Sequence, residues 1–201
     1  MPWIQNEAVG FLSGATANLT VVATRTLDEL FRWLPQHPEH ESELTDQGFL
    51  RRALSETSRL HPVSPALFRR SLVDTTLASG RRISAGELLY LELASANLDP
   101  EVFGARAGAF NPFRSLPDRV RGFGLGFGSG RHLCIGLQLS VGGPYRTSAG
   151  EEVLGGLLPV LLGELFTAGI ELDPADPPER DPTTFKPMFR RFPAVFTLVP
   201  G

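Results

Sequence analysis

Residues 97–133 are the part of this 201-residue sequence that most limits what the chain can fold into. Proline, glycine, asparagine and aspartate recur there too often for a long helix or strand. A loop of that length inside a compact domain is usually functional. The loop leads into residues 127–136, which read FGSGRHLCIG and enclose Cys134 between glycines. The thiol of Cys134, at the end of this irregular stretch, is therefore the first candidate for a functional group.

Cys134 is the only cysteine, and that count excludes whole classes of site. An internal disulfide, a CxxC redox pair and a multi-thiolate zinc site all need a second cysteine. Three interpretations remain for the thiol. It is a buried bystander, a nucleophile, or the single thiolate ligand of a metal.

Charge and hydropathy indicate which classes of binding partner the protein lacks. The formal net charge is −3, and the sequence lacks runs of lysine or arginine interleaved with aromatic residues. We therefore expect no nucleic-acid partner and no membrane partner. No window approaches about 18 uninterrupted apolar residues, and the first residues lack the pattern of a signal peptide. These features predict a cytoplasmic protein.

Hydrophobic periodicity predicts a mainly helical domain with one small β-sheet. Prolines and good N-cap residues mark the expected helix ends. In chain order we expect a helix over 8–34, a helix from Thr45 or Asp46 to Pro62, a small sheet over 63–95, the loop over 97–133, a helix within 151–168 that Pro159 kinks or delays, and a last strand or hairpin over 192–199.

The pattern around Cys134 suits the proximal ligand of a heme iron. Such a thiolate needs backbone close to the porphyrin, N–H groups directed at the sulfur, and a helix that starts just after it. Phe127 would shield the sulfur and His132 would reach a heme propionate. The alternative is a glycine-rich surface loop beside a buried cysteine.

Residues 127–136 match, without a gap, the Phe-Gly-x-Gly-x-(Arg/His)-x-Cys-x-Gly signature, and the chain resembles the cytochrome P450 superfamily. The resemblance implies heme b as cofactor, with iron held by Cys134. It also implies that the cofactor-binding residues of this segment are Phe127, Gly128, His132, Cys134 and Gly136.

Two other segments resemble elements of the same family. Glu56 and Arg59 match its Glu-x-x-Arg element and lie three residues apart on one helix face. Arg114 matches the later residue that completes this structural network, whereas the alternative for the first two is an ordinary exposed ion pair. The segment 68–74 resembles the strand that binds a heme propionate, which nominates Arg69 and turns Arg70 to the other face.

The resemblance implies a truncated cytochrome P450-like fold, namely the C-terminal, heme-binding half. The whole chain, 1–201, is then a single heme-binding domain. Its expected parts are the distal and Glu-x-x-Arg helices over 1–62, the small sheet over 63–95, the meander over 96–125, the cysteine loop and start of the proximal helix over 126–140, an insertion over 141–150, and the C-terminal helix and strands over 151–201.

Three departures from the family qualify this expectation. The chain has about half the family's length. It is then either a fragment, or a chain whose missing half is supplied by a second copy or a partner chain. The distal helix lacks the usual acid–alcohol pair, whether the motif falls at residues 13–18 or, counted back from His37 and Pro38, at residues 18–23. Thr16 and Asn18 are then left to hold a water in its place, or merely to cap or kink the helix. The insertion should break the proximal helix until about Glu151, which puts ordinary redox-partner docking in doubt.

The predicted function is a heme-thiolate, monooxygenase-like oxidoreductase that acts on a small organic molecule, in biosynthetic tailoring. Its oxidant would reach it through a ferredoxin or reductase partner, or as peroxide. One alternative keeps the heme for a peroxide-driven or redox-neutral reaction. Another is a non-catalytic, truncated partner subunit.

Overall fold

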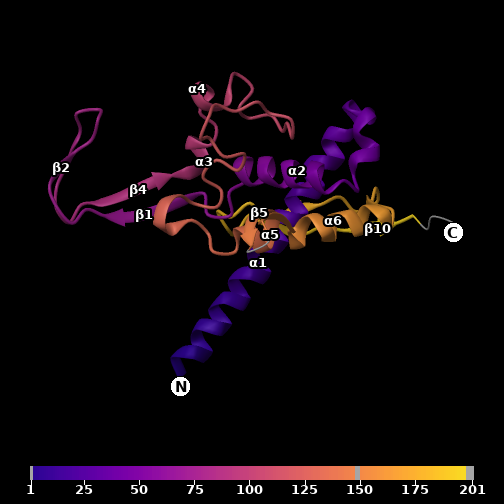
Figure 1. Ribbon diagram of the computed structural model, residues 1–201, viewed down its shortest axis with the longest axis horizontal. Coiled ribbons are helices and arrows are strands. Elements are labelled where there is room, and N and C mark those ends of the chain that lie inside the picture. The colour runs from indigo at the N-terminus through magenta and orange to yellow at the C-terminus, as the bar shows by residue number, and fades with distance from the viewer. Residues whose placement is uncertain (1, 148–149, 198–201) are drawn as a thin grey trace.

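The long helix α1 (Pro2–Trp33) enters the body of the molecule with its C-terminal part, and its N-terminal part projects beyond the rest (Figure 1). The structure is a computed structural model that describes residues 2–147 and 150–197. The helix starts six residues earlier than the apolar pattern predicts, with Pro2 in its first turn, where proline is tolerated. It ends before Pro35, as predicted. Two short 3₁₀ turns, η1 (Leu34–Gln36) and η2 (Pro38–Glu43), follow.

Helix α2 (Gln47–Leu60) begins and ends where the sequence predicts. The Asp46 carboxylate accepts a hydrogen bond from the Phe49 backbone N–H at 2.7 Å, which caps the first turn. Pro62 lies just beyond the last turn and prevents further helix.

The core lies between α2, the C-terminal part of α1 and α6 (Leu157–Thr167). Apolar side chains from these three helices interdigitate away from water, and their burial drives the assembly. The fully buried ones among them are Leu30, Phe49, Leu50, Ala53, Leu54 and Leu162.

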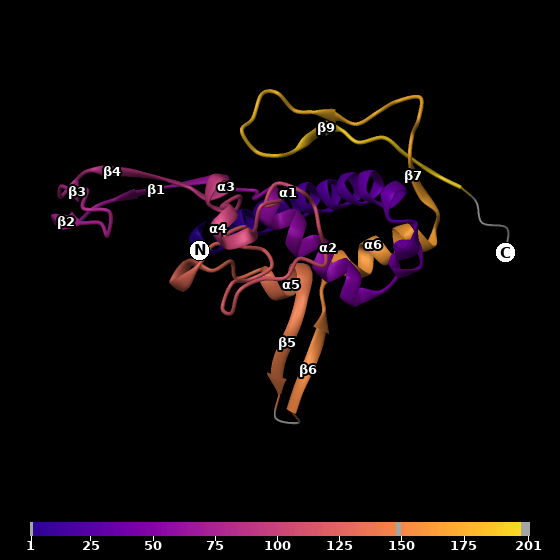
Figure 2. The ribbon, with the colours of Figure 1, turned by 90° about the horizontal axis from the view of Figure 1, so that it is seen from above.

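A β-arm leaves this core on one side (Figures 1 and 2). Strand β1 (Ala66–Arg70) pairs antiparallel with β4 (Leu88–Glu92), and β2 (Thr75–Thr76) pairs with β3 (Arg82–Ile83) further out. The predicted small sheet over 63–95 is confirmed as these two ladders.

Helix α3 (Leu93–Ala96) lies just before the predicted loop. The loop itself carries only two short elements, α4 (Pro100–Phe103) within it and η3 (Gly130–His132) at its end. Helix α5 (Leu137–Val141) then starts three residues after Cys134.

The predicted resumption of helix at Glu151 is wrong. Strands β5 (Gly142–Thr147) and β6 (Gly150–Gly155) form an antiparallel hairpin that extends away from the body (Figure 2), and α6 begins only at Leu157. Gly142 and Gly143 have positive φ angles, which end the helix and start the strand. Residues 151–155 then pair back on the insertion, so the hairpin extends beyond it. Residues 148 and 149 of the insertion lie outside the described residues.

The C-terminal part makes two further ladders. Strand β7 (Ile170–Leu172) pairs with β10 (Ala194–Phe196), and β8 (Glu179–Arg180) pairs with β9 (Phe189–Arg191). The predicted last strand is therefore present as β10, although residues 198 and 199 of that prediction lie outside the described residues.

Arg25 joins this C-terminal part to α1. Its side chain is 1% exposed, and its Nε donates to the Pro187 carbonyl at 2.5 Å. The guanidinium also lies 4.2 Å from the centre of the Phe189 ring. Burial, followed by the charge of Arg180, lowers the pKa of Arg25 to about 10. Arg25 therefore stays charged at neutral pH while it holds the two segments together.

Across residues 2–147 and 150–197, no helix is both long enough and apolar enough to cross a membrane.

Candidate functional site

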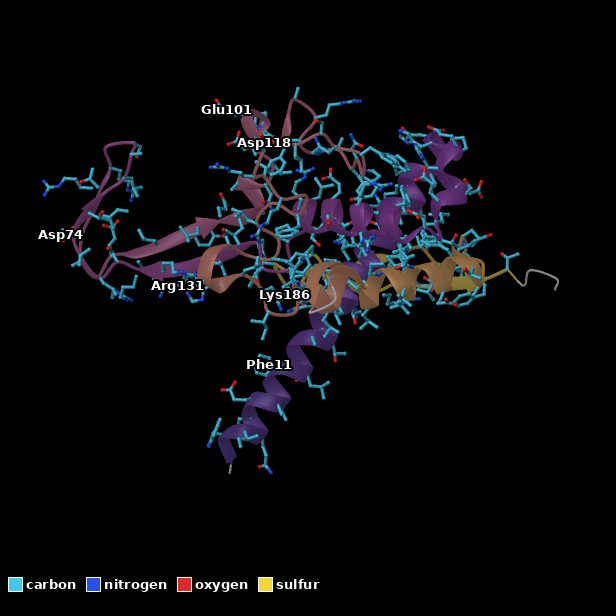
Figure 3. All side chains as sticks on the ribbon, in the orientation of Figure 1. Phe11, Asp74, Glu101, Asp118, Arg131 and Lys186 are labelled. Carbon is cyan, nitrogen blue, oxygen red and sulfur yellow. The ribbon has the colours of Figure 1, made fainter. Side chains whose placement is uncertain are left out.

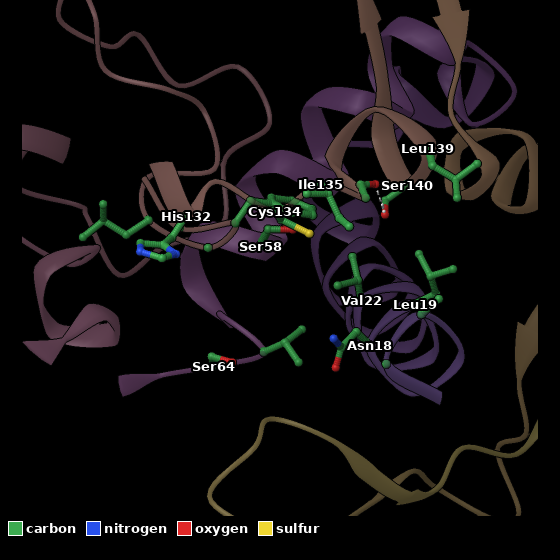
Figure 4. Close-up of a pocket in the computed structure, with 18 of the residues that line it drawn as sticks. Asn18, Leu19, Val22, Ser58, Ser64, His132, Cys134, Ile135, Leu139 and Ser140 are labelled. Carbon is green, nitrogen blue, oxygen red and sulfur yellow. Dashed lines mark hydrogen bonds between the residues drawn. The ribbon is translucent and has the colours of Figure 1, made fainter. Parts of the chain in front are cut away.

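A cavity of about 390 Å³ lies between the cysteine loop and α1. Figure 4 shows Cys134 and His132 from the loop on one side, and Asn18, Leu19 and Val22 from α1 on the other. The walls are mostly apolar. The same cavity includes the predicted residues Phe127, Gly128 and Gly136 among those that line it.

Backbone hydrogen bonds shape the loop that presents the thiol. The Cys134 N–H donates to the Phe127 carbonyl at 2.8 Å, which closes the loop on itself. Gly128 and Gly130 have φ angles of 75° and 62°, a conformation that favours glycine. Cys134 is exposed, so the thiol is accessible and the bystander interpretation, which requires a buried cysteine, is wrong.

The loop rests on the end of α2 at Gly126. A β-carbon at this position would overlap the Ser58 carbonyl oxygen, which belongs to the helix backbone and cannot rotate away. This close approach of Gly126 to the Ser58 carbonyl fixes the distance between the start of the cysteine loop and α2.

Gly126→Ala should therefore destabilise the protein by about 1–3 kcal/mol, the usual cost of overpacking. Urea unfolding followed by circular dichroism measures this free energy. Gly108→Ala is the matched control, because a β-carbon there meets nothing within 4 Å and no positive φ is involved. Equal unfolding midpoints for the two variants would show that the loop does not depend on this contact.

The structure brings Glu56, Arg59 and Arg114 together in a buried network. Arg59 donates two hydrogen bonds of 2.7 Å to the Glu56 carboxylate, and Arg114 donates to Glu56 Oε1 at 2.9 and 3.0 Å. The side chains of Arg59, Glu56 and Arg114 are 0%, 4% and 9% exposed. The alternative of an exposed ion pair is therefore wrong. Two cations share one carboxylate, so the network carries a net positive charge.

Asn97 links this network to the cysteine loop, a role that the sequence analysis missed. Its Nδ2 donates to the Arg59 carbonyl at 2.9 Å, and its own carbonyl accepts from Arg59 Nη1 at 2.6 Å. The side-chain oxygen accepts from the Leu125 N–H at 2.8 Å, just before Gly126. An asparagine at a helix C-cap has no local pattern that reveals contacts 28 and 38 residues away.

Arg69 lies on β1 and does not reach the cavity wall in this arrangement. Its Nη1 donates to the neighbouring Phe68 carbonyl, and the side chain is exposed. Strand alternation places Arg69 on the same face as Leu67, which does line the cavity. Arg70 bonds instead to the Gly86 carbonyl.

The two predicted distal residues are placed differently. Asn18 lines the cavity, whereas Thr16 is absent from its lining. The Thr16 hydroxyl donates to the Leu12 carbonyl at 2.9 Å within α1. Because successive helical residues are turned by about 100°, Thr16 leaves the face that Asn18 occupies. The expectation that both residues act together at the site is therefore wrong for Thr16.

The cavity is flanked by apolar side chains that no other part of the described chain covers. Ile135 is 82% exposed and Leu139 62% exposed beside the thiol. Phe11, on the projecting part of α1, is 59% exposed (Figure 3). The cavity is therefore enclosed by the cysteine loop and α1, and it is open on the side of these exposed apolar residues.

Comparisons with known proteins identify the family of this chain. The family model "Cytochrome P450" matches residues 22–141. Indoleacetaldoxime dehydratase of Arabidopsis thaliana is 29% identical over 122 residues, which are 57% of this chain and 24% of the relative. Mycinamicin VIII C21 methyl hydroxylase of Micromonospora griseorubida is 36% identical over 108 residues, which are 53% of this chain and 26% of the relative.

The fold agrees as well. The crystal structure of substrate-free CYP109E1 from Bacillus megaterium superposes with a TM-score of 0.70 at 21% identity, and the match covers 94% of this chain and 44% of that one. The mainly helical fold predicted from the sequence is confirmed, and it corresponds to less than half of that neighbour. The chain spans about a quarter of the length of the two curated relatives. Because the family match extends over more than half of its residues, the chain belongs to the cytochrome P450 family.

Proposed function

We propose that this chain binds heme b through the Cys134 sulfur and acts as an oxidoreductase on a small organic molecule. The observation that carries the proposal is the position of Cys134. An exposed thiol, on a loop braced against α2, lines an apolar cavity of about 390 Å³. Apolar walls with few polar groups are typical of cofactor and small-molecule sites.

The protein ligands available at this site fit a metal ion whose other ligands belong to a cofactor. In the described part of the chain, no group of three or more His, Cys, Asp or Glu side chains is placed to hold an ion. Cys134 alone offers one ligand, which suits an iron already held by four porphyrin nitrogens. The apolar side chains of Leu19, Val22 and Leu139 line the cavity and would contact the faces of a macrocycle.

Each remaining residue then has a role toward the cofactor. His132, which lines the cavity, would bind one of its carboxylates, and Arg69 would bind the other after its side chain leaves the Phe68 carbonyl and turns toward the cavity. Phe127 would exclude water from the sulfur, and Gly128 and Gly136 leave room for close approach. A thiolate-ligated heme, when bound, supplies oxidative chemistry with dioxygen or peroxide.

Asn18 is the polar group of α1 that faces the cavity. Its amide can donate and accept, so it can hold a water and orient a substrate hydroxyl or carbonyl. No carboxylate among the described lining residues accompanies it. Proton delivery at this site would therefore depend on water and substrate more than on an acid side chain.

The name of one relative supports the proposed substrate class. A relative is named as a methyl hydroxylase of mycinamicin VIII, which supports hydroxylation of a natural product in biosynthetic tailoring. Electrons would come from a ferredoxin or reductase, or the oxidant would be peroxide. The open side of the cavity would be closed by a second copy or by a partner chain.

The test is reconstitution of the purified 201-residue chain with heme. We expect about one heme per chain, and a strongly red-shifted Soret band after reduction under carbon monoxide. Solution mass, measured on the same sample, reports whether a monomer or an assembly holds the heme. Absence of stoichiometric heme binding would overturn the proposal.

A redox-neutral reaction is the second candidate. A relative is named indoleacetaldoxime dehydratase, and a dehydration needs no external electrons. The lack of a carboxylate beside Asn18 favours this chemistry, because oxygen activation by reductive cycles consumes protons. Turnover of an aldoxime by the heme-loaded chain without reductant or peroxide would support the second candidate. Turnover coupled to a reductase would support the first.

A further inference from the structure

A second cavity, of about 440 Å³, lies on the outer face of α2. It is separate from the cysteine cavity, because the two share no lining residue. Arg51, Arg52 and Ser55 from α2 form one wall, and the loop after α4 forms the other with Asn111 and Arg114. Arginine side chains from two elements thus converge on one hollow.

The charge of this cavity is positive. Three arginines line it against one carboxylate, Glu56. That carboxylate is already engaged by Arg59 and Arg114 and accepts the Asn111 N–H at 3.2 Å. Since Arg59 is also charged, the buried network of Glu56, Arg59 and Arg114 adds positive charge beside the cavity.

Two of the lining side chains have free hydrogen-bonding capacity. Within residues 2–147 and 150–197, Arg51 makes no hydrogen bond or ion pair, and neither does the Ser55 hydroxyl. Arg52 reaches Glu43 at 3.5 Å, the outer limit of a contact, and lies 4.9 Å from the centre of the Phe113 ring. The spacing of Arg51 and Ser55, four residues apart, puts both on one helical face.

We propose that this cavity binds the phosphate group of a small molecule. The arginine fork matches the oxygens of a phosphate in pairs, and a hydroxyl adds a further donor. Asn111 offers its side-chain amide beside them, although its oxygen accepts the Phe113 N–H. Pro112 and Leu116 supply an apolar wall. The volume exceeds what a phosphate alone requires, so the cavity has space for a small organic group.

Calorimetric titration of the 201-residue chain tests the proposal without heme or substrate. Inorganic phosphate is titrated at constant ionic strength, with chloride as the balancing salt. We expect saturable binding that Arg51→Gln weakens about tenfold or more, since a charge-assisted hydrogen bond is lost. The matched control is Arg82→Gln on β3, an exposed arginine far from the cavity, which should bind phosphate as the unmodified chain does.

Two further measurements complete the test. Circular dichroism melting of Arg51→Gln checks that the fold persists, and Ser55→Ala provides a milder second variant. Titration with glycerol 3-phosphate distinguishes the source of the phosphate group. Tighter binding than inorganic phosphate indicates a phosphate ester that uses Pro112 and Leu116, and equal binding indicates free phosphate. No saturable binding, or equal weakening by Arg51→Gln and Arg82→Gln, would overturn the proposal.

Discussion

Cys134→Ser should abolish the red-shifted Soret band of the reduced, carbon monoxide-bound protein. The shift depends on electron donation from a thiolate, and a serine hydroxyl stays protonated and donates poorly. The side chains have nearly the same shape, and the hydrogen bond from the residue 134 N–H to the Phe127 carbonyl belongs to the backbone. The loop should therefore keep its fold while the spectral signature is lost.

The control for this variant is Ser129→Ala in the same loop. Ser129 is exposed, makes no capping hydrogen bond and does not line the cavity. Its substitution should leave the band in place. Equal thermal melting of the two apoproteins would separate loss of the ligand from loss of the fold. A red-shifted band that persists in Cys134→Ser would contradict Cys134 as the ligand.

Glu56→Gln should lower the free energy of unfolding by about 3–5 kcal/mol. The substitution keeps the size of the side chain but removes the charge that Arg59 and Arg114 share. Arg59 is 0% exposed, so it would be left buried with no anion to compensate it. Since domains of this size are stable by only about 5–15 kcal/mol, much of the stability would be lost.

Urea unfolding measures this effect, with Glu101→Gln as control. Glu101 is exposed at the start of α4, and its carboxylate has no ion-pair partner among the described residues. The double variant Glu56→Gln with Arg114→Met should cost clearly less than the sum of the two single changes, because both break the same network. Additive costs, or a Glu56→Gln cost below 1 kcal/mol, would show that the network does not hold the fold.

The predictions that held depend on local chemistry. Asp46 was recognisable as a cap because its partner, the Phe49 N–H, is three residues away. Glu56 and Arg59 were recognisable as a pair because they are one helical turn apart. The glycines that enclose Cys134 also form a local pattern, and Gly128 and Gly130 take positive φ angles in the loop.

The predictions that failed depended on neighbours remote in the chain. Residues 151–155 are compatible with a helix by composition, but their pairing with residues 142–147 made them a strand. Thr16 was nominated by order in the sequence, whereas the rotation of α1 against the cysteine loop decides which residues line the cavity. No local pattern marks Asn97, because its partners lie at Arg59 and Leu125.

The sequence by itself determined the family, the capped helix α2 and the loop that presents Cys134. The residues that identify each of these features lie within about ten positions of one another. The tertiary structure alone decided that Asn97 ties the Glu56 network to the cysteine loop, and that a basic hollow opens on the outer face of α2. Those features arise where separate elements pack. Packing is set by the summed burial of many side chains, which no short pattern contains.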